Sequence, residues 1–240
     1  MITFLSTIAK QVIKYFSFNR GKSNNRSNDN EEEDTDWPPE ELIFEYTLEH
    51  AEGDKSIPED VMYVRFHSDI ELGWMDAFKD NEHLEMVVLN EGLRNIGDGM
   101  FEGCESLQKI TFPSTLIKVN DDAFCNSGLI KVELNDGLEV IGLDAFVDCK
   151  SLKSIEFPST VRRIGESAFY GCCNLKKMVL NEGLRKVEDS VFKGCISLES
   201  IKFPSTIRYI GANAFDHSSP VHNRSDLKEI VFNDGLLRIE

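Results

Sequence analysis

A phenylalanine that returns every 22 or 23 residues constrains the fold of this chain more than any other feature. A leucine follows most of these phenylalanines by six residues, and apolar residues stand three and five positions beyond that leucine. A fixed period of this length indicates stacked supersecondary units, because one such unit is too small to bury its apolar face alone. The repeated residues are Phe78, Phe101, Phe124, Phe146, Phe169, Phe192 and Phe215.

Each repeat begins with a short predicted strand, since apolar and polar residues alternate over a few positions. These strands start at Val61, Leu84, Leu107, Leu129, Leu152, Leu175, Leu198 and Leu227. The turn after each strand alternates between an Asn-Glu-Gly or Asn-Asp-Gly version and a Phe-Pro-Ser-Thr version. Proline fits where a strand ends, because it has no amide donor for the ladder.

The second half of each repeat has the pattern Ile-Gly-x-x-Ala-Phe-x-x-Cys. This segment is too short for a long helix, so we expect one helical turn or a 3₁₀ piece whose phenylalanine points inward. Glycine and asparagine adopt a positive φ most easily. We therefore expect a positive φ at the residue after the isoleucine, which is Gly97, Asn120, Gly142, Gly165 or Gly211; Glu188 is the exception.

The stretches IGESAFYGCCNLKKMVLNEGL and IGLDAFVDCKSLKSIEFPSTV resemble the BspA-like class of leucine-rich repeat. The resemblance extends over about residues 61–240. It implies an α/β leucine-rich-repeat solenoid of about eight 23-residue coils, with a parallel β-sheet on the concave face and short helical or 3₁₀ turns outside. The family offers no catalytic residues to carry over. The pattern changes at residues 125–128, at residues 216–226 and in the first coil, where Leu72-Gly73-Trp74 replaces Ile-Gly.

Charge and composition divide the chain of 240 residues into four predicted parts. Residues 1–19 form a basic amphipathic segment, and residues 20–41 form an acidic linker with few aliphatic residues. Residues 42–60 form an N-terminal cap region that contains one weakly alternating strand pattern. The repeat array takes up residues 61–240, and its last coil stops before a phenylalanine, so we expect self-association through that edge or a longer protein.

The N-terminal segment has Ile2, Leu5, Ala9, Val12 and Phe16 on one helical face and no acidic residue. Three interpretations stay open: an organelle-targeting segment, a helix in contact with an anionic membrane surface, or a helix that packs on a protein. No run of 18 apolar residues predicts a membrane span. We expect a cytoplasmic location unless residues 1–19 direct the chain to an organelle.

Four cysteines, Cys104, Cys149, Cys172 and Cys195, stand three residues after their phenylalanine. Their shared position predicts a ladder of buried, reduced thiols inside the stack. Cys125 and Cys173 fall outside the ladder, and their orientation is ambiguous. No paired cysteine spacing predicts a zinc site, and we expect neither a metal nor a cofactor.

The predicted strands present two outward residues in each central coil, and these residues are free to vary because packing does not fix them. The formal net charge of −16 argues against nucleic-acid binding, and no motif suggests an enzyme. We therefore expect a non-catalytic module that binds an unidentified protein or peptide, the alternative being a cell-surface adhesion or structural repeat. The candidate binding residues are Lys109, Thr111, Lys131, Glu133, Ser154, Glu156, Lys177, Val179, Ser200 and Lys202.

Overall fold

The computed structural model describes residues 38–52, 56–216, 227–232 and 236–239. The predictions for residues 1–19, and for the linker as far as residue 37, lie outside the described residues. The chain divides into two units, residues 1–43 and 44–240. The described part of the first unit holds a short 3₁₀ helix, η1 (Glu40–Leu42).

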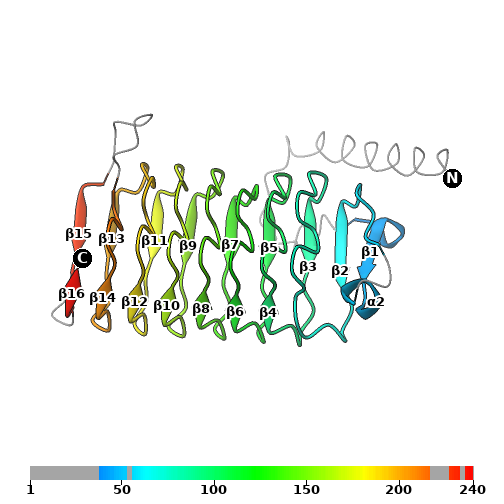
Figure 1. The fold of residues 1–240 in the computed structure, drawn as a ribbon, viewed down its shortest axis with the longest axis horizontal. Coiled ribbons are helices and arrows are strands. Elements are labelled where there is room, and N and C mark those ends of the chain that lie inside the picture. The colour runs from blue at the N-terminus through cyan, green and yellow to red at the C-terminus, as the bar shows by residue number, and fades with distance from the viewer. Residues whose placement is uncertain (1–37, 53–55, 217–226, 233–235, 240) are drawn as a thin grey trace, which may run out of the picture. The chain divides into compact units, whose positions relative to one another are not determined.

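The second unit is a parallel array in which each repeat adds one strand to each of two sheets. Figure 1 shows the strands of the two sheets as two rows along the array. The nine-stranded sheet has the order β1 (Ile43–Tyr46), β2 (Tyr63–Phe66), β3 (Met86–Val88), β5 (Lys109–Thr111), β7 (Lys131–Glu133), β9 (Ser154–Glu156), β11 (Lys177–Val179), β13 (Ser200–Lys202) and β15 (Glu229–Val231). The seven-stranded sheet contains β4 (Asn95–Ile96), β6 (Lys118–Val119), β8 (Val140–Ile141), β10 (Arg163–Ile164), β12 (Lys186–Val187), β14 (Tyr209–Ile210) and β16 (Arg238–Ile239).

This architecture confirms the predicted solenoid, although seven coils rather than eight contribute a strand to both sheets. The second sheet was not predicted, because its strands are only two residues long. The repeat period sets the register of both sheets: Lys131 pairs with Ser154, and Ser154 pairs with Lys177. The middle residue of each three-residue strand points into the core, as Ile110 does with an exposed fraction of 1%.

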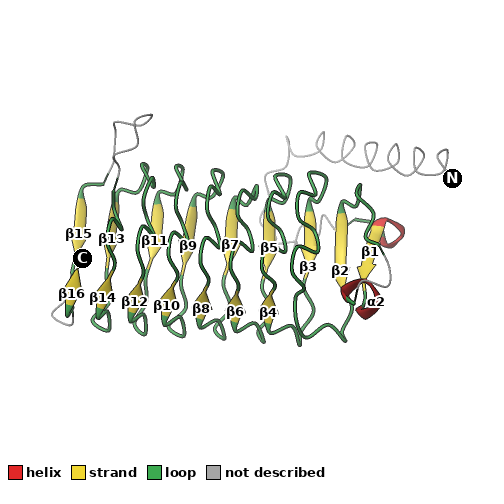
Figure 2. Cartoon of the chain, in the orientation of Figure 1, coloured by secondary structure: helices red, strands yellow, loops and turns green. Residues whose placement is uncertain are grey.

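The phenylalanine segments are turns rather than helices, and Figure 2 shows loops there between the strands. Hydrogen bonds within a coil alternate with bonds between coils. Cys104 N donates to Phe101 O at 3.3 Å, whereas Phe101 N donates to Ala123 O of the next coil at 2.9 Å. Left-handed residues two positions before and after the phenylalanine, such as Asp122 and Asn126 with φ of 55° and 56°, interrupt any regular helix.

The phenylalanine rings form a continuous stack inside the coils. From Phe78 to Phe169 the ring centroids of neighbours are 5.2–5.5 Å apart, with interplanar angles of 4–12°. Offset stacking of this kind adds about 0.5–1.5 kcal/mol per pair beyond the burial of apolar area. The recurrent phenylalanine is therefore the residue that joins each coil to the next.

The prediction of a positive φ at the glycine after the isoleucine was wrong. Gly97, Gly142, Gly165 and Gly211 are not among the residues with positive φ. A Cβ atom on Gly165 would lie 2.5 Å from the backbone C and O atoms of Gly142. Glycine is required here because the coils approach closely, and the left-handed conformation occurs two residues later.

The N-terminal end of the array carries aromatic packing of its own. The strand pattern predicted in the cap region corresponds to β1, and helix α2 (Leu48–Ala51) follows it. Tyr46 is 1% exposed, and its ring centroid lies 4.8 Å from Phe66 and 5.2 Å from Phe78. Among the described residues, no helix is both long and apolar enough to span a bilayer.

Candidate functional site

The ten predicted binding residues all lie on the nine-stranded sheet, two on each of the strands β5, β7, β9, β11 and β13. On every one of these strands the pair flanks one buried residue. Eight of the ten residues are exposed, and Ser154 and Val179 are partly buried. The structure therefore brings the predicted residues together on one face.

This face has a basic row and an acidic row. Lys109, Lys131, Ser154 and Lys177 are register neighbours on successive strands. Two residues further along, Glu133 pairs in register with Glu156. Neighbouring strands lie about 4.8 Å apart, and residues two positions apart lie about 6.6 Å apart along a strand. The two rows of opposite charge are thus separated by roughly the same distance as alternate residues of an extended peptide.

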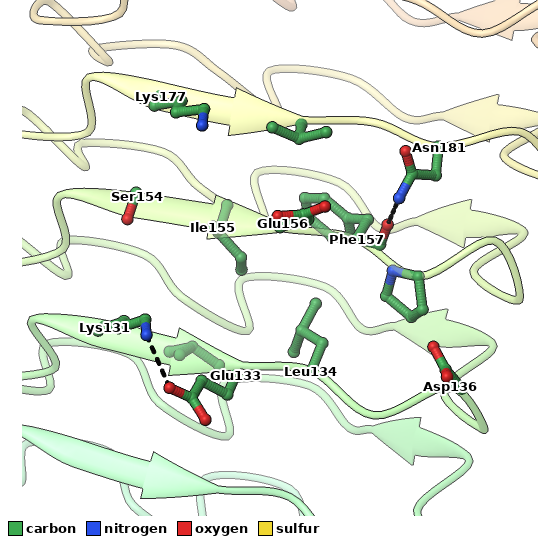
Figure 3. Close-up of a pocket in the computed structure, with 13 residues that line it drawn as sticks. Lys131, Glu133, Leu134, Asp136, Ser154, Ile155, Glu156, Phe157, Lys177 and Asn181 are labelled. Atoms are coloured by element: carbon green, nitrogen blue, oxygen red, sulfur yellow. Dashed lines mark hydrogen bonds and ion pairs between the residues drawn. The ribbon is translucent and has the colours of Figure 1, made fainter. Parts of the chain in front are cut away.

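A hollow of about 380 Å³ crosses the face over β7, β9 and β11. Figure 3 shows Lys131, Ser154 and Lys177 on three neighbouring strands at one end of it, with Asp136 and Asn181 toward the other. The turns after the strands supply the residues that sequence reasoning missed, which are Leu134, Asp136, Phe157, Pro158 and Asn181. Their positions depend on the turn conformation, which the repeat pattern did not specify.

The two lysines of the hollow have different surroundings. Lys131 Nζ lies 2.7 Å from Glu133 Oε1, and this hydrogen bond, with the charge of Lys131, lowers the pKa of Glu133. Lys177 is exposed and has no ion pair among the described residues. Ser154 lies between the two lysines in the sheet and is small. The space above Ser154 is therefore flanked by two ammonium groups and suits an anionic group.

The turn beside the hollow differs from its counterparts in the other coils. In two turns a glutamate side chain reaches the next coil: Glu91 accepts from Ser114, and Glu182 accepts from Ser205. The corresponding residue beside the hollow is Asp136, which is exposed and makes no such bond to the described residues. The hydroxyl of Thr160 is buried there without a hydrogen-bond partner.

The predicted cysteine ladder is buried. Cys104, Cys149, Cys172 and Cys195 are each 0% exposed, and each thiol donates to the carbonyl of the phenylalanine in the preceding coil at 3.1–3.2 Å. At residues 125–128 the ladder position is held by Ser127, whose hydroxyl lies 3.2 Å from Cys149 Sγ.

The ladder thiols have no chemical role that the geometry supports. Burial raises the pKa of Cys104 and Cys195 to about 12. All six cysteines are free thiols. Within the described part of the chain, no group of three or more His, Cys, Asp or Glu side chains has the geometry of a metal site. The cysteines therefore act as small packing residues.

Comparison with family models decides the class of this repeat. The model of the BspA type leucine rich repeat region matches residues 74–172 and 117–240, with six copies. The chain belongs to this family. No curated protein sequence matches it.

Solved structures of repeat proteins share the fold. A leucine-rich repeat protein from T. pallidum is 24% identical, with 73% of this chain and 80% of that chain covered and a TM-score of 0.57. The pneumococcal vaccine antigen PcpA is 20% identical, with 73% and 57% covered and a TM-score of 0.40. A leucine-rich repeat protein from Bacteroides ovatus is 18% identical, with 75% and 74% covered and a TM-score of 0.34.

Proposed function

We propose that this BspA-type repeat protein is a non-catalytic module that binds a protein or peptide on its nine-stranded sheet. The observation that carries this proposal is the hollow over β7, β9 and β11, where two charged rows meet the apolar groups of the following turns. Interfaces of this kind combine an apolar centre with a charged rim. Packing does not explain the charges, because their side chains are exposed.

The shape of the hollow favours an extended partner segment. It is open along the strands and mixes apolar groups, such as Leu134 and Pro158, with the charges of Lys177 and Glu156. The sheet offers no row of aromatic side chains, which a base or a sugar ring would need for stacking. A peptide that places an acidic and a basic residue two positions apart would meet both rows.

Affinity capture with the full chain tests this proposal. The variant Lys131→Glu with Lys177→Glu reverses the basic row and should lose the partners that the parent chain captures. The variant Lys150→Glu with Lys193→Glu makes the same change of charge in two phenylalanine turns outside the sheet and should keep them. Glu166→Lys, also outside the sheet, should keep them as well.

Thermal melts of the variants must overlay that of the parent, because the replaced side chains are on the surface. If the control pair abolishes capture and the sheet pair does not, the binding face has been assigned wrongly. Localisation of the intact protein separates this function from the alternative of a cell-surface adhesion or structural repeat.

A further inference from the structure

A second charged surface lies at the start of the seven-stranded sheet, away from the residues of the hollow. We call it the basic corner, and it consists of Arg162, Arg163, Arg185, Lys186 and Arg208. Two columns of residues from successive coils form it. Arg185 N donates to Arg162 O, and Arg208 N donates to Arg185 O, each at 2.9 Å. In the adjacent column Arg163 pairs in register with Lys186.

The side chains of the basic corner face solvent. Both arginines of the first coil, Arg185 and Arg208 are exposed, and Lys186 is partly exposed. The sixth position of the two columns is Tyr209, and Lys186 Nζ lies 5.0 Å from the centre of its ring. Five of the six positions in three consecutive coils are therefore basic, in a chain whose net charge is −16.

Neutralisation of these charges within the array is incomplete. Glu188 Oε1 lies 2.7 Å from Arg163 Nε and 2.8 Å from Lys186 Nζ. The guanidinium of Arg162 bonds instead to the carbonyls of Ser159 and Gly183, at 3.3 and 3.2 Å, which hold it in place without cancelling its charge. Among the described residues, neither Arg162 nor Arg185 forms an ion pair. Glu139, which precedes Arg162 in the first column, is the acid that borders the corner there.

The repeat itself does not require this arrangement. The same two columns in the three preceding coils contain Arg94, Ile117 and Glu139, and Asn95, Lys118 and Val140. Like charges on neighbouring strands lie about 4.8 Å apart and destabilise a sheet. The corner thus concentrates a repulsion that the other coils avoid, which is expected of a surface kept for an anionic ligand.

We propose that the basic corner binds an acidic segment of a partner protein, independently of the nine-stranded sheet. Four of the five groups are guanidinium groups, whose fork of N–H donors matches a carboxylate in two parallel hydrogen bonds. Successive carboxylates of a short acidic run can meet successive coils.

The charge of the whole chain decides between a short acidic segment and a long polyanion. Attraction to the corner acts within a Debye length, about 8 Å at physiological ionic strength. A short acidic segment fits within that range. A nucleic acid or a long sulfated polysaccharide extends beyond the corner and meets the negative charge of the rest of the chain.

Fluorescence anisotropy with the full chain and a labelled octaglutamate peptide tests the proposal. The parent should bind the peptide at about 20 mM salt and lose affinity steeply as the salt rises. The variant Arg162→Gln with Arg185→Gln should weaken binding about tenfold, which corresponds to about 1.4 kcal/mol. The matched control Arg94→Gln with Lys118→Gln removes two charges from the same columns in earlier coils and should change the affinity less than twofold.

Further arms keep the test decisive if the double variant is unstable. The single variant Arg185→Gln leaves the bonds of Arg162 intact and should still weaken binding. Reversal of Lys131 and Lys177 on the sheet should leave octaglutamate binding unchanged. The proposal is overturned if the parent does not bind the peptide at low salt, or if the control pair weakens binding as much as the corner pair. It is also overturned if a heparin octasaccharide or an eight-nucleotide single strand binds more tightly than octaglutamate.

Discussion

Ser205 donates two hydrogen bonds to the carboxylate of Glu182, one from its backbone amide at 3.1 Å and one from its hydroxyl at 2.8 Å. The two residues belong to successive coils, so the bonds tie one Asn-Glu-Gly turn to the next Phe-Pro-Ser-Thr turn. Ser114 and Glu91 repeat the link with the same two distances. Asp136 is one methylene shorter than glutamate, and no such link joins it to the described residues of the next coil.

Replacement of Asp136 by glutamate should therefore stabilise the array. The longer carboxylate would reach Ser159 as Glu91 reaches Ser114. Because a shift of 1 kcal/mol moves the melting temperature of a domain of this size by about 2–4 °C, we expect a rise of roughly that order in a thermal melt. The reverse change, Glu91→Asp, should lower the melting temperature, and an equal melting temperature for both variants and the parent would contradict the link.

The pH dependence of this effect has a defined sign. Hydrogen bonds from Ser114 lower the pKa of Glu91, and hydrogen bonds from Ser205 lower the pKa of Glu182. A carboxyl group with a lowered pKa stabilises the fold above its ordinary pKa and loses that contribution as the pH falls through its lowered pKa. The gain from Asp136→Glu should accordingly be present at pH 7 and disappear in strong acid.

Asp144→Asn should also stabilise the array at neutral pH, for the opposite electrostatic reason. Burial, together with the charges of Asp122 and Glu166, raises the pKa of Asp144. The ionised side chain is therefore disfavoured in the fold, and this penalty is lost as the pH falls through the raised pKa. Asparagine tolerates the left-handed φ of 52° at this position.

We expect Asp144→Asn to raise the free energy of unfolding by up to about 0.5 kcal/mol at pH 7, the usual scale for a surface substitution. Chemical denaturation at pH 7 and at a pH below 4 measures the change. The comparison variant is Glu133→Gln, which should be destabilising at pH 7 because Lys131 lowers the pKa of Glu133. A gain for Asp144→Asn that persists unchanged in acid would show that charge is not its cause.

The ladder cysteines should resist a thiol reagent in the native protein. Their side chains are fully buried, and burial raises the pKa of Cys104 and Cys195 to about 12, so almost no thiolate forms at pH 8. All six thiols should react in denaturant. Rapid native labelling of more than Cys125 and Cys173, which are partly exposed, would show that the ladder opens.

Sequence reasoning succeeded where a single period determines the structure. The spacing of Phe146 and Phe169 predicted the coils, and the position of Cys172 three residues later predicted its burial. The alternation around Ile155 predicted which residues of β9 point outward. Each of these inferences depends only on a repeat that stacks in register.

The features that sequence reasoning missed depend on distances between coils. Strands such as β10 are two residues long, so alternation within them cannot be detected in a sequence. The hollow depends on the conformation of the turns at Asp136 and Asn181, because Asn181 Nδ2 donates to Phe157 O at 2.6 Å and so lies toward the sheet. The role of Gly165 depends on how closely one backbone approaches another.

Gly165 provides a test of that last correction. If glycine were needed for a positive φ, asparagine would be tolerated at this position better than alanine. Close approach of the coils predicts that both substitutions are harmful, because any Cβ would lie 2.5 Å from the backbone of Gly142. The glycine column contains Asn120 and Glu188, but no two adjacent members of the column both carry a side chain. A side chain at residue 165 would be adjacent to Glu188 and would break that pattern.

We therefore expect Gly165→Ala and Gly165→Asn each to lower the free energy of unfolding by about 1–3 kcal/mol, the usual cost of overpacking. The comparison variant is Ser167→Asn, two residues later, where φ is 52°. Asparagine adopts this left-handed conformation readily, so this variant should be as stable as the parent or slightly more stable. Urea denaturation measures all three variants. If Gly165→Asn matches the parent while Gly165→Ala does not, the conformational explanation is right and close approach is not the reason for the glycine.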